Sequence, residues 1–164
     1  MRCIFVPTVP TTAFLLLILL AAGCAGGPPP APEATETVAL TVAHRTQRGA
    51  LLIEGTTDLP DGAELTYTIT HDAAATLPMT EWPAANLIES GRSVVQGGQY
   101  WARVTTTSWP AGRVRVLLQF PLPPQPAEVV ARYGEFGEKL AGDNVISEGP
   151  INAVEAEYIF ELRR

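Results

Sequence analysis

The sequence predicts an all-β fold in which two antiparallel sheets pack face to face. Apolar residues alternate with polar or charged ones in three segments, over residues 65–70, 113–120 and 153–162. A period of two is what a strand needs when one face is buried and the other meets solvent. The chain has 164 residues, which leaves room for one domain and little more.

The sequence predicts seven strands, over residues 38–44, 50–57, 63–71, 87–96, 99–107, 113–120 and 153–162. Proline precedes glycine in the turns Leu59–Gly62 and Pro110–Gly112, and Gly97–Gly98 predicts a two-residue hairpin turn with positive φ. Seven short strands separated in this way indicate an immunoglobulin-like or fibronectin-III-like antiparallel β-sandwich over residues 38–164. A small barrel would show the same periodicity and is the alternative.

Two stretches interrupt the alternation. Residues 72–85 are expected to form a crossover loop between the sheets. Residues 121–152 are expected to form a long loop before the last strand, with a short helix over Pro126–Tyr133. Proline suits the first turn of a helix, Glu128 favours its N-terminal end and Gly134 ends it.

The long loop holds the candidate contacts for a protein partner, because loops of this length in a compact sandwich often carry function. It brings aromatic and charged side chains within a few positions of one another. The candidate residues are Arg132, Tyr133, Glu135, Phe136 and Glu138. The alternative is that these side chains pack onto the edge of the sandwich and cap it.

The first residues predict export. Arg2 is the only charge before Glu33, and an apolar run covers Ala13–Ala22. A ten-residue helix rises about 15 Å, half the thickness of the hydrocarbon core, so this run is too short to span a bilayer comfortably. A positive tip followed by a short apolar run and small residues is typical of a secretory signal peptide.

The end of that run, Leu20–Cys24, resembles the lipobox of bacterial lipoproteins, in which a peptidase cuts before a cysteine whose thiol carries a diacylglyceryl group. Ala21 stands where the family prefers leucine. The resemblance implies a signal peptide over residues 1–23, acylation of Cys24 and anchoring at the extracytoplasmic face of a bacterial membrane. An ordinary signal peptide, in which Cys24 is incidental, is the alternative.

A tether is expected between the lipid and the sandwich. Residues 24–37 are rich in proline and alanine and hold no large apolar residue, so they favour an extended spacer. Cys3 would be removed with the signal peptide and Cys24 acylated. No thiol then remains for a disulfide, so the domain depends on its hydrophobic core.

The turn segments Leu59–Gly62 and Pro110–Gly112, together with Pro126–Gly142, resemble immunoglobulin-like domains of exported bacterial proteins. The resemblance covers most of residues 38–164. It implies a fold and brings no catalytic residues with it.

Composition argues against nucleic acid as a partner. The formal net charge is −6, the single lysine is Lys139, and the arginines are scattered from Arg2 to Arg164. Neutralising a phosphate backbone requires clustered basic residues. We therefore expect no nucleic-acid binding.

No catalytic or metal-binding pattern is recognisable. His44 and His71 are the only histidines, and we expect both at strand ends in solvent. Asp58 and Asp61 fit a turn stabilised by carboxylates better than a calcium loop. No serine lies in a nucleophile motif. The sequence thus predicts no enzyme, no metal and no cofactor.

Aromatic residues offer a second function. The three tryptophans are Trp82, Trp101 and Trp109. Tyr100 and Trp101 must point to opposite faces of their strand, so one is expected inside and the other at the surface. Buried aromatics dominate the energetics of sandwiches, and core positions are the simpler interpretation. An exposed tryptophan, however, can stack on sugar rings.

Together these observations predict a membrane-anchored extracytoplasmic lipoprotein of the cell envelope. Its β-sandwich is expected to be a non-catalytic module that contacts another envelope protein. The alternative is a carbohydrate- or cell-wall-binding module that uses an exposed tryptophan.

Overall fold

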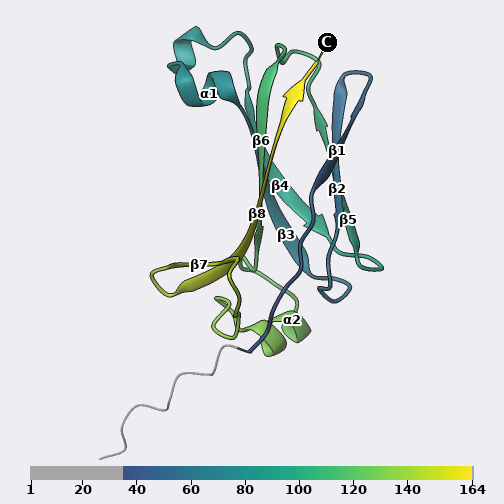
Figure 1. The fold of residues 1–164 in the computed structure, drawn as a ribbon, viewed down its shortest axis with the longest axis vertical. Coiled ribbons are helices and arrows are strands. Elements are labelled where there is room, and N and C mark those ends of the chain that lie inside the picture. Colours follow the sequence, from purple (N-terminus) through teal and green to yellow (C-terminus); the bar gives the residue numbers. More distant parts are fainter. Residues whose placement is uncertain (1–34, 164) are drawn as a thin grey trace, which may run out of the picture. The chain divides into compact units, whose positions relative to one another are not determined.

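The computed structural model describes residues 35–163 and contains two antiparallel sheets (Figure 1). One sheet has the order β1-β2-β5, with β1 (Ala43–Gln47), β2 (Ala50–Thr56) and β5 (Gln99–Thr105). The other has the order β4-β3-β6-β8-β7, with β3 (Glu64–His71), β4 (Ile88–Val94), β6 (Gly112–Phe120), β7 (Val145–Glu148) and β8 (Ile151–Leu162). The helices are α1 (Asp72–Thr76), the 3-10 turn η1 (Met79–Glu81) and α2 (Ala127–Tyr133). The predicted lipid site, Cys24, lies outside the described residues.

The pairing confirms the predicted sandwich. In a seven-strand immunoglobulin sandwich the second strand pairs with the fifth, and the third pairs with the sixth. Here β2 pairs with β5 and β3 with β6, while β8 takes the place of the last strand beside β6. The fourth strand, β4, pairs with β3. No strand of one described sheet pairs with a strand of the other, which makes this a sandwich rather than a closed barrel.

The core lies between the sheets, where the predicted alternation puts it. On β6, Val114, Val116, Leu118 and Phe120 are all fully buried. Arg113 and Arg115 on the opposite face of β6 are exposed and pair with glutamates of β8. The register of the central strand is therefore fixed by its apolar face.

The first strand begins later than predicted. Between Val38 and Val42 the chain makes an isolated bridge, Leu40 with Thr57, and a backbone hydrogen bond from Thr41 to Thr56, while the regular ladder with β2 starts at Ala43. Side chains take part at this point of the edge: the Tyr100 hydroxyl donates to the Thr41 carbonyl, and the Thr41 hydroxyl accepts from the Thr56 N–H in place of a backbone carbonyl.

The expectation of a crossover loop over residues 72–85 is wrong. These residues form α1 and η1 and connect β3 to β4, which are neighbours in the same sheet. The expectation that His71 lies in solvent is also wrong, because its side chain is buried. His71 accepts a hydrogen bond from the Ala73 N–H, which caps α1, and meets the Trp109 ring edge-on.

The predicted helix before the last strand is present as α2, with Pro126 at its N-terminal cap and Gly134 (φ 89°) after its last residue. The remainder of residues 121–152 contains a strand that the sequence did not predict. β7 forms a hairpin with the start of β8 around Gly149. Most of its residues are exposed, so its sequence lacks the alternation of apolar and polar residues that predicts a strand.

The domain begins earlier than Val38. The backbone N–H groups of Thr35 and Glu36 both donate to the Lys139 carbonyl, and the Glu36 carbonyl accepts from Ala141. The Glu36 carboxylate also pairs with Arg132 of α2 at 2.8 Å. Thr35 and Glu36, near the end of the predicted tether, are therefore bonded to α2 and to the loop that follows it.

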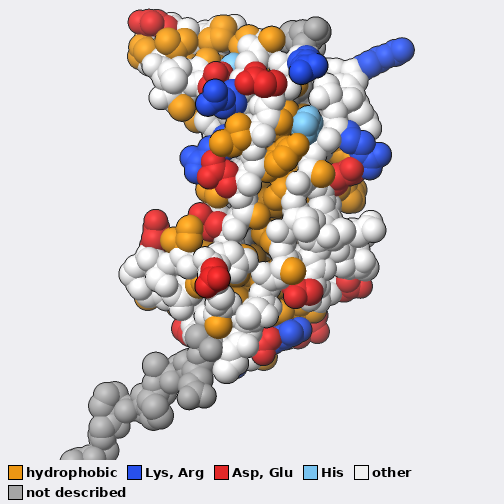
Figure 2. Space-filling model, in the orientation of Figure 1, with side chains coloured by type: hydrophobic (Ala, Val, Ile, Leu, Met, Phe, Trp, Pro, Cys, Tyr) orange, Lys and Arg blue, Asp and Glu red, His pale blue; other side chains and the backbone are white. Residues whose placement is uncertain are grey.

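Side chains close the seam between β1 and β8. Figure 2 shows an apolar stripe running between the two sheets, with a histidine beside it. His44 of β1 stacks on Phe160 of β8 with ring centroids 3.7 Å apart, and its Nδ1 lies 3.0 Å from the Tyr158 hydroxyl. One imidazole thus joins the two sheets where no backbone ladder does.

This seam should make stability depend on pH. Burial lowers the pKa of His44 from its usual value of 6.5, so the folded state favours the neutral ring. The unfolded chain then binds the proton more readily, and stability should be constant above about pH 7 and fall as the pH drops below 6.5. Urea midpoints at pH 7.5 and 5.5 measure this. His44→Gln should reduce the difference between them, and an unchanged difference would contradict the assignment.

Candidate functional site

Trp101 is the most exposed tryptophan of the described chain. Its side chain is 65% exposed on the outer face of β5, whereas its neighbour Tyr100 is 2% exposed. The predicted division between one inward and one outward aromatic is therefore confirmed. Trp109 is buried, and Trp82 is half-buried with its indole N–H donating to the Leu77 carbonyl. Among the tryptophans, Trp101 alone offers most of its ring to a ligand.

A buried serine holds Trp101 in place. The Gly97–Gly98 turn has positive φ at both residues (58° and 70°), as predicted. The strands on either side of it then diverge into different sheets. At the point of divergence the Ser93 hydroxyl donates to the Trp101 carbonyl at 2.7 Å and accepts from the Trp101 N–H at 3.1 Å. One hydroxyl thus satisfies both backbone groups of Trp101 that β4 would otherwise pair.

Beside Trp101 the outer face of the three-stranded sheet is hollowed, with a volume of about 540 Å³. Polar groups surround this hollow. They are Thr41, Arg45, Glu54, Thr56 and Gln99, with the half-buried Leu52 as an apolar member. We call this surface the Trp101 face.

An ion pair forms one wall of the Trp101 face. Arg45 Nε lies 2.6 Å from Glu54 Oε1, and Arg45 Nη2 lies 2.5 Å from Glu54 Oε2. The hydrogen bonds between them raise the pKa of Arg45 and lower the pKa of Glu54. Both groups therefore stay charged near neutral pH, and their remaining N–H groups and lone pairs face solvent beside the indole.

The floor of the hollow is closely packed. The Tyr100 hydroxyl bonds the Thr41 carbonyl, and burial raises the pKa of Tyr100, so the phenol stays neutral and keeps its donor. Gly55 lies directly against these groups, and a Cβ there would collide with both the Thr41 carbonyl and the Tyr100 ring. The glycine is needed for this close approach.

Of the predicted partner contacts in the long loop, Arg132, Glu135 and Phe136 are exposed, Glu138 is half-buried and Tyr133 is buried. Tyr133 is buried and packs edge-on against Phe120, so its contribution is to the core. Arg132 is tied to Glu36. Glu138 accepts a hydrogen bond from the Phe136 N–H at 3.1 Å. Only Glu135 and Phe136 remain exposed without such a role among the predicted residues.

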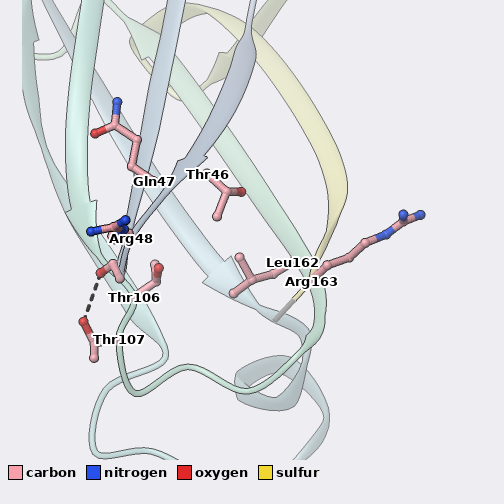
Figure 3. A pocket seen from close by; sticks show the side chains of 8 residues that line it. Thr46, Gln47, Arg48, Thr106, Thr107, Leu162 and Arg163 are labelled. Carbon is pink, nitrogen blue, oxygen red and sulfur yellow. Dashed lines mark hydrogen bonds between the residues drawn. The ribbon is translucent and has the colours of Figure 1, made fainter.

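A second hollow lies at the end of the sandwich away from α2, between the β1–β2 turn and the end of β8 (Figure 3). Its volume is about 420 Å³, and threonines contribute much of its lining. Thr107 donates to the Gly49 carbonyl at 3.0 Å and so fastens the two loops together. Arg163 points away from the hollow (Figure 3). The charged groups do not converge on a common point.

Neither histidine stands in a cluster of ligating groups. Within residues 35–163, no three side chains of His, Cys, Asp or Glu gather so as to hold a metal ion. His44 is engaged with Phe160, and His71 with the cap of α1. The absence of a metal and of catalysis stays a prediction.

The part of the chain that the structure describes contains no helix both long and apolar enough to cross a membrane. Comparisons of the chain with protein-family models, with curated proteins and with solved structures found no match.

Proposed function

We propose that the protein is a lipid-anchored, extracytoplasmic binding protein of a bacterial envelope, and that the Trp101 face binds a glycan. The anchor is inferred from Leu20–Cys24 and the binding activity from the sandwich. The module acts without catalysis in this proposal. The observation that carries the glycan assignment is the exposure of Trp101 beside paired polar groups.

A sugar ring suits such a surface chemically. Its C–H faces are apolar and can lie flat on an indole, while its hydroxyls need donors and acceptors at the ring's rim. The Arg45–Glu54 pair offers both kinds of group within one bidentate contact. Gln99 and the hydroxyls of Thr41 and Thr56 add further partners on the same face. The held backbone of Trp101 limits the entropy lost on binding.

The apolar area of this face is small for a protein partner. Specific protein interfaces bury about 800 Å² on each side, with apolar residues concentrated at the centre. On the Trp101 face the only large exposed apolar side chain is Trp101 itself, and apart from the half-buried Leu52 the larger side chains around it are charged or polar. A single aromatic platform with a polar surround favours a small hydroxylated ligand.

The position of the face agrees with a ligand close to the membrane. The described chain starts at Thr35 beside α2, and the turn before Trp101 lies at the same end of the sandwich (Figure 1). The spacer expected from the sequence over residues 24–37, at about 3.1 Å per residue, would hold Thr35 within a few tens of Å of a lipid on Cys24. Envelope glycans are within reach there.

The test is Trp101→Ala, measured by co-sedimentation with insoluble cell-wall polysaccharides. Loss of the platform should weaken binding by about tenfold or more, which corresponds to about 1.4 kcal/mol. Phe136→Ala is the matched control, because it removes an exposed aromatic ring that lies outside the Trp101 face. Equal losses in both variants, or none in Trp101→Ala, would refute the assignment.

Protein contact at the long loop is the second candidate. It is favoured by the 36% exposure of Phe136 next to Glu135, on a loop held by backbone hydrogen bonds to Thr35 and Glu36. Crosslinking in native membranes tests it. Loss of a co-purifying protein in Phe136→Ala, with Trp101→Ala unaffected, would support this second candidate.

A further inference from the structure

We infer that the glycan bound by the Trp101 face is anionic, and that Arg103 receives its carboxylate. This inference rests on the proposed function and specifies its ligand class. It comes from a third hollow, which we call the Arg103 hollow and which Trp101 also lines. Trp101 contributes to the lining of the Trp101 face and of the Arg103 hollow, so a ligand stacked on its ring can reach into each.

The Arg103 hollow opens where β4 and β5 separate. Beyond the Ser93–Trp101 clamp the two strands belong to different sheets, and the space between them has a volume of about 330 Å³. Its lining residues are Tyr67, Arg92, Ser93, Val94, Gln96, Trp101, Ala102 and Arg103. It therefore contains two arginines and no carboxylate, in a chain whose net charge is −6.

The two arginines differ in what they already bind. Arg92 pairs with Glu64 at 2.7 Å and donates to the carbonyls of Pro123 and Pro124, so it serves to hold that segment. Arg103 is exposed and forms no ion pair with any residue in the range 35–163. Opposite it on β2 stands Leu52, which cannot neutralise it. Arg103 is the uncompensated charge of this surface.

The spacing suits a charged sugar. Trp101 and Arg103 are two positions apart on one strand, which places their side chains on the same face with backbones about 7 Å apart. A sugar ring stacked on the indole can direct a carboxylate, its own or that of the next ring, toward the guanidinium. A planar guanidinium binds a carboxylate through two parallel hydrogen bonds. Uronic-acid polymers carry such a group on successive rings.

The test compares charged and neutral forms of the same backbone, with purified full-length protein in detergent. The probes are oligogalacturonate and oligomannuronate, each with its methyl ester, measured by calorimetry. At least one acid should bind about tenfold tighter than its ester, and the advantage should shrink with added salt. Arg103→Gln should bring the acid down to the level of the ester and leave binding of the ester unchanged.

Two further variants keep the result specific. Arg103→Lys retains the charge but cannot form the two parallel hydrogen bonds of a guanidinium. It should therefore keep part of the preference for the acid that Arg103→Gln loses. Arg113→Gln removes an exposed arginine from the other sheet and should leave the preference intact. Thermal midpoints of all variants should match, because these side chains are exposed.

The inference and the proposed function fail differently. If acid and ester bind equally, and both are lost in Trp101→Ala, the anionic ligand is wrong and glycan binding stands. If a preference for the acid survives Arg103→Gln, Arg103 is not its receptor. If no acid or ester binds, both proposals are overturned.

Discussion

Cys24→Ala is expected to release the protein from membranes or to stop its processing. The lipobox resemblance assigns an acylated cysteine at this position, and each buried methylene of an acyl chain contributes about 0.8 kcal/mol. Two or more chains hold a protein durably, so their loss should move nearly all of it from the membrane fraction. Cell fractionation, with the mass of the mature N-terminus, measures both effects.

Cys3→Ala is the matched control for this experiment. Cys3 lies at the start of the predicted signal peptide and should be absent from the mature protein. Its replacement should change neither processing nor fractionation. If Cys24→Ala stayed bound to membranes and was processed like the parent, the lipid anchor would be wrong.

Leu118→Ala should cost about 2–5 kcal/mol of unfolding free energy. Leu118 lies on the inner face of β6 and is fully buried. Its truncation leaves a cavity as well as lost apolar burial. Since a domain of this size has a stability of about 5–15 kcal/mol, the variant should be close to unfolded at the lower end of that range. Urea denaturation followed by tryptophan fluorescence measures the loss.

Leu117→Ala is the internal comparison, with the same chemistry one position away. Leu117 lies on the outer face of β6 and is partly exposed, so its truncation should cost about 1 kcal/mol or less. Similar losses for the two leucines would mean that the register of β6 is not as described.

Local pattern was sufficient for most of the strands. On β6 and β8 the inner face is apolar and the outer face carries charges that pair across the ladder, as Arg115 and Glu157 do at 2.8 Å. The turns were readable for the same reason. Gly97 and Gly98 adopt positive φ, which few other residues accept.

Features that depend on contacts between distant residues could not be predicted from the local sequence pattern. β7 is defined by its pairing with β8 and has little apolar pattern of its own. His71 is buried because Trp109 approaches it from the β5–β6 connection. Around the late start of β1, Thr41 is contacted by the Tyr100 hydroxyl, which comes from a strand far along the chain. Each is a tertiary effect on a locally plausible segment.

The sequence predicted that one aromatic residue of the candidate site is exposed, but not which one or what surrounds it. Alternation required one of Tyr100 and Trp101 to face outward, but the choice depends on which face of β5 meets the other sheet. The Arg45–Glu54 pair and the Ser93 clamp arise from strand pairing and sheet divergence. No spacing in the sequence could signal them, because their members come from different strands.

The central claim, that the Trp101 face binds a glycan, is tested most directly by NMR titration with soluble cell-wall oligosaccharides. Nitrogen-labelled protein should show its largest shift changes at the Trp101 indole N–H, with smaller changes at Arg45 and Gln99 on the same face. Signals of the long loop, including Phe136, should stay in place. Shift changes confined to that loop, or none at Trp101 at saturating oligosaccharide, would contradict the account.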